Sequence, residues 1–231
     1  MIDILLLLIL AGVTWCVASE GPWGAATTFF SVVFAGLLAM NFFEPVAAAI
    51  SSSPPWNVRA DVIALLGLFA LGVTGFRVAI EYLQPTQIEV PPMFYDATRW
   101  AMGLLTGYLT MAIVLTALHT APLPREFLGF RPERSNFLEM SAPDRQWLAF
   151  TQHCSERIYS TGNIFDGSVF PVAGQPAQVW SSFPIRYADR RERFASGGAG
   201  GGAASGPASS APPPPPAGAT PRGGRSGTQN F

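Results

Sequence analysis

The sequence predicts an all-α membrane protein. It has four transmembrane helices arranged as two hairpins, then a short, partly helical juxtamembrane segment and a disordered tail rich in Gly, Ala and Pro. Four apolar runs support this prediction, and they cover residues 4–18, 25–43, 62–80 and 100–118. A helix of about 19 residues is about 28 Å long, close to the hydrocarbon thickness of a bilayer. No comparable run follows residue 120.

The composition of the runs argues against two alternatives. A buried helix of a soluble protein keeps a polar stripe, whereas residues 5–13 and 62–73 carry no charged side chain at any angle. Strands are disfavoured because apolar and polar residues do not alternate, and a helix satisfies its backbone groups without water. We therefore expect an integral helical protein surrounded by a lipid bilayer.

The first hairpin is indicated by the turn sequence Ser19-Glu20-Gly21-Pro22, which is too short for anything but an antiparallel connection. Asp3 lies just before the first run, and no Lys or Arg occurs before Arg59. A secretory signal peptide needs a positively charged start, so we expect the first span to be retained.

The second run is expected to close near Glu44 and Pro45, with residues 46–50 continuing along the interface as a short helix. Asp61 is a plausible start for the third helix. Near the far end of that helix Arg77 and Glu81 are four residues apart on one face, where the arginine can pair with Glu81 or snorkel to the interface.

The fourth run opens with Asp96 and Arg99, spaced as a helical ion pair, and with Trp100 as an interfacial aromatic residue. Gly103 and Gly107 follow with the Gly-x-x-x-Gly spacing that lets another helix approach closely. We expect this pair to pack the fourth helix within its own bundle; a homodimer interface is the alternative.

Beyond the membrane domain, residues 1–120, the chain divides into a soluble juxtamembrane segment, 121–195, and a low-complexity tail, 196–231. A short amphipathic helix is predicted near 142–160, because Ser141-Ala142-Pro143-Asp144 resembles a capped helix start. Its apolar face comprises Trp147, Leu148, Thr151, Cys154 and Ile158. This helix either lies on the membrane or a partner, or packs on the chain's own loops.

The tail carries only Arg222 and Arg225 as charges and includes the proline run 212–216. It cannot bury enough apolar surface to order itself, so we expect a disordered tether, with a proline-rich recognition ligand as the alternative. A formal net charge of -1 without a concentrated basic surface gives no argument for nucleic acid. Cys16 and Cys154 form neither a disulfide framework nor a metal motif, and no cofactor motif is present.

Several of these features together resemble the colicin V production protein family of bacterial inner-membrane proteins. The resemblance covers about residues 1–120 and rests on the following positions: Ile2, Asp3, Gly21, Gly24, Pro45, Asp96, Arg99, Gly103 and Gly107. Family members usually carry arginines in the first loop, where this chain has Glu20. The resemblance implies a four-span protein of the inner membrane associated with toxin production or export and with envelope integrity. It does not imply an enzyme.

Two functions follow from these observations. The first is a scaffold or assembly factor that acts with other membrane proteins; the second is a small oligomeric transporter or channel. Charges near the span ends are the residues to test for a translocation path: Glu44, Arg77, Glu81, Asp96 and Arg99. His119 and His153 make no convincing catalytic pair, so we expect no enzyme.

The orientation in the membrane is open. Arginines 125, 131 and 134 favour a cytoplasmic tail, whereas Arg77 and Arg99 favour the reverse. The number of arginines close to the last span favours, on balance, a cytoplasmic tail.

Overall fold

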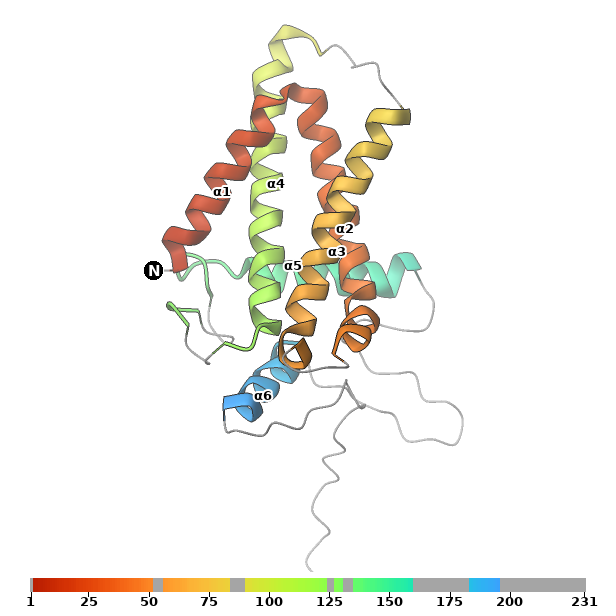
Figure 1. Ribbon diagram of the computed structural model, residues 1–231. Coiled ribbons are helices and arrows are strands. Elements are labelled where there is room, and N and C mark those ends of the chain that lie inside the picture. The colour runs from red at the N-terminus through yellow and green to blue at the C-terminus, as the bar shows by residue number, and fades with distance from the viewer. Residues whose placement is uncertain are drawn as a thin grey trace, which may run out of the picture.

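The computed structural model describes residues 2–51, 56–83, 90–123, 127–130, 135–159 and 183–195. Four long helices form a bundle (Figure 1): α1 Ile2–Ser19, α2 Gly21–Ile50, α3 Trp56–Leu83 and α4 Pro92–Thr120. All four are long and apolar enough to cross a membrane. The predicted all-α, four-span fold is confirmed; the tail at 196–231 lies outside the described residues.

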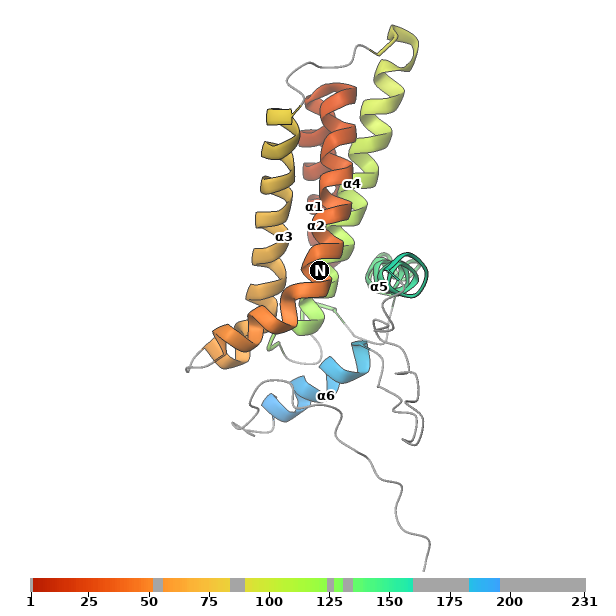
Figure 2. The same ribbon diagram turned by 90° about the vertical axis from the view of Figure 1, so that its right-hand side faces the viewer.

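The second helix does not close near Glu44 and Pro45 as predicted. Helix α2 continues through Pro45 to Ile50, so the short helix predicted at 46–50 is its last part. Proline cannot donate a hydrogen bond to the carbonyl of Asn41, which weakens the helix there. The result is a bend towards the end of α2 and no break (Figure 2). Packing against neighbouring helices lets a membrane helix keep such a proline.

The third helix begins at Trp56 and not at Asp61, so the predicted start was wrong. Pro54 and Pro55 precede it in the sequence, and prolines commonly stand at helix starts because they have no N–H group to leave unpaired. Asp61 lies inside the helix, and its side chain is buried.

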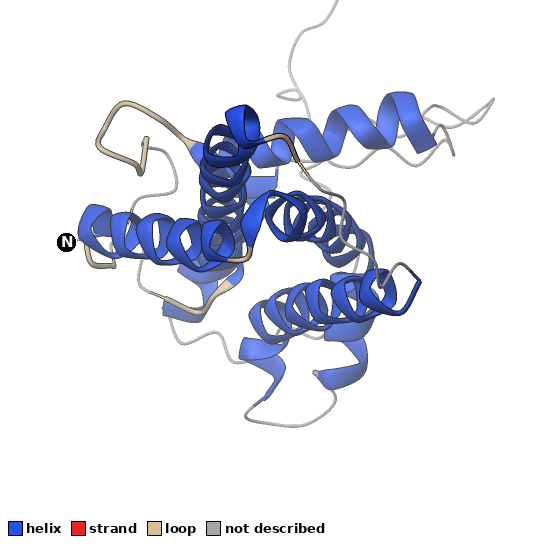
Figure 3. Cartoon of the chain, turned by 90° about the horizontal axis from the view of Figure 1, so that it is seen from above, coloured by secondary structure: helices blue, strands red, loops and turns tan. Residues whose placement is uncertain are grey.

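The closest packing in the bundle is between α2 and α3 and between α1 and α4, with much less contact within the hairpins α1–α2 and α3–α4. Seen from above, α1 starts at the N label and leans away from the other helices (Figure 3). The α1–α2 turn is tight because Gly21 adopts a φ of 84°, which residues with a side chain rarely adopt. Helices α1 and α2, and helices α3 and α4, are thus linked in sequence but pack mainly on other helices, whereas the consecutive helices α2 and α3 pack closely on each other.

Small residues explain which helices pack closely on each other. A Cβ atom placed on Gly72 of α3 would lie 2.9 Å from Cβ of Ala35 on α2. Ala35, Gly36 and Ala39 give α2 a narrow buried strip on which α3 and α4 can approach. Close approach of backbones provides the van der Waals contact that holds helices together in lipid.

Two further helices follow the bundle. Helix α5, Pro143–His153, continues into a π-helical segment, Cys154–Tyr159, in the region where a helix was predicted. Helix α6, Phe183–Ala195, lies near the end of the bundle that carries the α2–α3 connection (Figure 1). Phe183 and Tyr187 of α6 pack on Phe43 of α2, with ring centroids 6.3 and 6.5 Å apart.

The predicted capping of α5 was wrong. Its N-cap residue is Ala142, and no side chain caps the helix. Ser141 and Asp144 bind residues of α4 instead. Helix α5 packs on α4, and its Trp147 reaches Gly36 of α2, so it rests on the bundle and not on loops.

Candidate functional site

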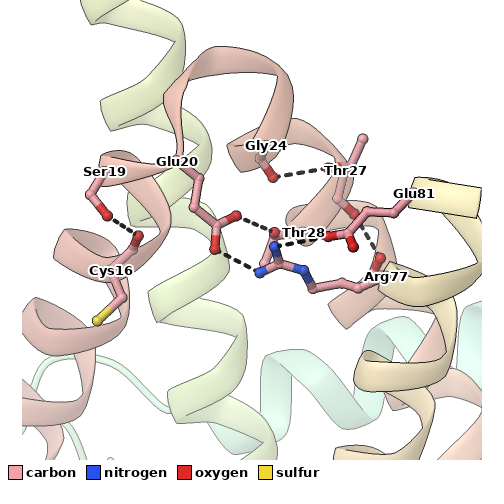
Figure 4. Close-up of polar contacts among 9 residues, drawn as sticks. Cys16, Ser19, Glu20, Gly24, Thr27, Thr28, Arg77 and Glu81 are labelled. Atoms are coloured by element: carbon pink, nitrogen blue, oxygen red, sulfur yellow. Dashed lines mark hydrogen bonds and ion pairs between the residues drawn. The ribbon is translucent and has the colours of Figure 1, made fainter. Parts of the chain in front are cut away.

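One end of the bundle holds an ion-pair cluster at the α1–α2 turn (Figure 4). Arg77 lies 2.7 Å from Oε1 of Glu20 and 3.7 Å from Glu81, and the Thr28 hydroxyl donates to Oε2 of Glu20 over 3.2 Å. The predicted neighbour Glu81 is present, but Glu20, 57 positions away in sequence, makes the shorter contact. This cluster ties α3 to the turn between α1 and α2.

The same end carries the predicted Asp96–Arg99 pair, with 2.8 Å between the charged atoms. The Arg99 guanidinium also lies over the rings of Tyr95 and Trp100, at 5.6 and 5.7 Å from their centroids. The ring centroid of Trp15 of α1 is 6.0 Å from that of Trp100. Clustered aromatic rings and arginine are typical of the boundary between lipid and water.

Glu44 lies near the opposite end of the bundle and pairs with Arg186 of α6 at 3.6 Å. Each of the five charges singled out from the sequence therefore faces a group of opposite sign. The structure divides them among three separate ion-pair groups, at the α1–α2 turn, at the start of α4 and between α2 and α6.

The two glycines of α4 lie directly against α1. A Cβ atom on Gly103 would be 2.9 Å from the carbonyl oxygen of Thr14, and one on Gly107 would be 2.8 Å from that of Leu10. Such short distances leave no room for a side chain. The Gly-x-x-x-Gly surface is thus occupied inside the bundle.

The sequence did not predict a fully buried pair formed by His119 and Asp144. Nε2 of His119, at the end of α4, is 2.7 Å from Oδ2 of Asp144 in the first turn of α5, and both side chains are 0% exposed. The Phe130 ring meets the imidazole edge to face at 5.0 Å. Nδ1 of His119 and Oδ1 of Asp144 are buried without a hydrogen-bond partner.

The geometry of this pair argues against a catalytic dyad. In hydrolases one imidazole nitrogen faces the carboxylate and the other faces a nucleophile. Here Nε2 faces Asp144, while Nδ1 is buried and has no hydroxyl or thiol bound to it. The pair instead joins α4 to α5, because His119 belongs to α4 and Asp144 to α5. Removing one partner of a buried pair leaves the other uncompensated.

A second polar contact lies nearer the middle of α4. The Tyr108 hydroxyl donates to Oε1 of Gln146 over 2.6 Å and lies 3.1 Å from Oγ of Ser141. We call the contacts of Tyr108, His119, Ser141, Asp144 and Gln146 the α4–α5 junction. Of these residues, only His119 was considered from the sequence as a chemical group, and Ser141 and Asp144 were considered only as part of a helix cap.

Apolar contacts also hold α5 against the bundle. A Cβ atom on Gly36 would lie 2.7 Å from the Trp147 ring and 2.8 Å from Ile113, so the missing side chain makes room for the indole. Cys154 is buried in the same apolar cluster, and this burial raises the pKa of its thiol. Among the described residues, no group of three or more His, Cys, Asp or Glu side chains could hold a metal ion.

The fold and these features define an all-helical, multi-pass membrane protein. Comparisons with models of protein families, with curated proteins and with solved structures find no match to the chain. The resemblance to the colicin V production family therefore rests on the residues quoted above.

Proposed function

We propose that the chain is a scaffold or assembly factor of the bacterial inner membrane, with a role in toxin production or export or in envelope maintenance. The α4–α5 junction is the observation that supports this role most directly. It commits Tyr108 and His119, polar residues of α4, to holding a segment from outside the bundle. A carrier would need such groups free to meet a substrate.

The alternative is a small oligomeric transporter or channel. Four helices of this length line a pore only together with other copies, and the Gly103–Gly107 surface suited to such contacts is filled by α1. Each charge proposed for a path is paired with a group of opposite sign near an end of the bundle. Both findings favour the scaffold.

We also propose that the protein is not an enzyme and that its tail faces the cytoplasm. Among the residues that the structure describes, more arginines lie on the side of α5 and α6 than on the opposite side, which carries Arg77 and Arg99. A reporter active on only one side of the membrane, fused after Ala195, tests the orientation.

Complementation of a strain lacking the gene separates the two functions, with envelope integrity and toxin secretion as readouts. For a scaffold, Arg77→Gln and Asp96→Asn should complement if the protein inserts, whereas deletion of 196–231 should lose cross-linked partner proteins. If either charge variant inserts normally yet fails to complement, while the tail deletion complements fully, the transporter is favoured and the scaffold proposal is wrong.

A further inference from the structure

Helix α5 runs across the bundle, and it is seen almost end-on beside α4 in the second view (Figures 1 and 2). It is amphipathic, with Trp147, Leu148 and Thr151 buried against the bundle and Arg145 and Phe150 exposed. The position along the membrane-spanning helices at which α5 crosses them, here called its level, determines what surrounds its exposed face.

The contacts of α5 fix that level along the spans. Trp147 lies against Gly36 of the apolar run 25–43, and Ile113 of the run 100–118 borders the same space beside Gly36. The junction residues Tyr108 and His119 bracket α5 on α4, and their separation of 11 positions is about 16 Å along a helix. Helix α5 therefore lies beside membrane-spanning segments and not beyond their ends.

The start of α1 gives an independent marker of the same level. The Leu138 N–H group, five positions before α5, donates to Oδ1 of Asp3 over 2.8 Å, and the Ile2 N–H group donates to the carbonyl of Leu128 over 2.9 Å. Asp3 is the first charged residue of the shortest span. The boundary between hydrocarbon and headgroups at this side thus passes close to α5.

The two flanks of α5 differ in the way that this boundary requires. Phe150 is four residues after Gln146 and shares its flank, which Tyr108 binds from the middle of α4. Phe150 is 42% exposed there and contacts Trp147 at 5.5 Å between centroids. Arg145 is five residues from Phe150, about 140° around the helix, and so faces the other way.

We propose that α5 is an in-plane interfacial helix at the boundary of headgroups and acyl chains, in the leaflet on the side where α1 begins and α4 ends. Phe150 points towards the acyl chains and Arg145 towards the headgroups. An amphipathic helix of this kind buries its apolar side in the interface. The occupant of the exposed face is lipid, which continues from the lipid-facing surface of the spans. The inference needs only the membrane bundle and is independent of the scaffold role.

Spin labelling of the full chain in phosphatidylcholine and phosphatidylglycerol vesicles tests this. Single cysteines replace Phe150 and Arg145 in a background of Cys16→Ser and Cys154→Ala, and the accessibility of each label to oxygen and to a water-soluble nickel chelate is measured. Leu71→Cys, at a position 73% exposed within the α3 span, is the lipid reference, and Ser210→Cys in the tail is the aqueous reference.

We expect the Phe150 label to favour oxygen over nickel several-fold, as the Leu71 label does, and the Arg145 label to have a ratio nearer the aqueous reference. A Phe150 label with the ratio of the Ser210 label overturns the proposal, whether water or a soluble partner covers that face in the cell. If Phe150→Cys does not fold, Gln146→Cys, at the exposed position on the same flank, is read by the same criterion.

Discussion

His119 and Asp144 join the last transmembrane helix to the first helix outside the bundle through a contact of 2.7 Å that no solvent reaches. Their remaining polar atoms, Nδ1 and Oδ1, have no hydrogen-bond partner. The pair is therefore sensitive to the loss of either member, because burial penalises an unmatched polar or charged group.

Replacement of Asp144 by Ala should destabilise the folded protein by about 3–5 kcal/mol, since it leaves His119 buried without its partner. Unfolding in detergent monitored by circular dichroism measures the effect. The double variant His119→Phe with Asp144→Leu should recover part of the loss, because it leaves no polar group unmatched. Equal stability of Asp144→Ala and the parent chain would show that the pair does not hold α5.

Substitution of Gly107 by Leu should separate α1 from α4, because even a Cβ atom would lie 2.7 Å from Thr14 and 2.8 Å from the Leu10 carbonyl oxygen. The expected result is a clear loss of thermal stability and of monodisperse protein in size-exclusion chromatography. Gly67→Leu is the matched control, since nothing lies within 4 Å of a Cβ atom there. Similar behaviour of the two variants would contradict the packing of α4 on α1.

Arg77 should couple more strongly to Glu20 than to Glu81, since the contacts are 2.7 and 3.7 Å. The Arg77 and Glu20 side chains are each about one-third exposed, so we expect a coupling of about 1 kcal/mol or less. Double-mutant cycles with Arg77→Gln, Glu20→Gln and Glu81→Gln measure both couplings. A larger coupling to Glu81 would show that the pair within α3 dominates.

Cys154 should resist alkylation in the folded protein. Its thiol is buried and its pKa is raised, so less thiolate is present at pH 8 than for an ordinary cysteine. In a Cys16→Ser background, labelling by a water-soluble maleimide should be slow at pH 8, faster at higher pH and complete after unfolding. Met140→Cys, at a position 86% exposed, gives the fast reference rate. Equal rates at the two positions would place Cys154 at the surface.

Local spacing explains which parts of the structure could be predicted. The four spans follow from runs of apolar residues, and the Arg77–Glu81 and Asp96–Arg99 pairs follow from neighbours one helical turn apart. Glu20 was not predicted as a partner of Arg77, nor Asp144 as a partner of His119, because tertiary packing brings these residues together across 57 and 25 positions.

Helix α6 did have a local signal that was not used. Phe183, Tyr187 and Arg191 recur at intervals of four, and all three are buried in the folded chain. By contrast, the start of α3 had two competing local signals, since Asp61 is a common helix-start residue whereas Pro54 and Pro55 favour a start directly after them.

The close fit of Gly103 and Gly107 on α1 has a consequence for the order of biogenesis. The ribosome makes α1 first and α4 last among the spans, so α1 enters the bilayer well before its main packing partner exists. Until then its only protein neighbour is α2, which it contacts little. Release of α4 from the insertion machinery is therefore the step that completes the bundle, and it also creates the surface on which α5 rests.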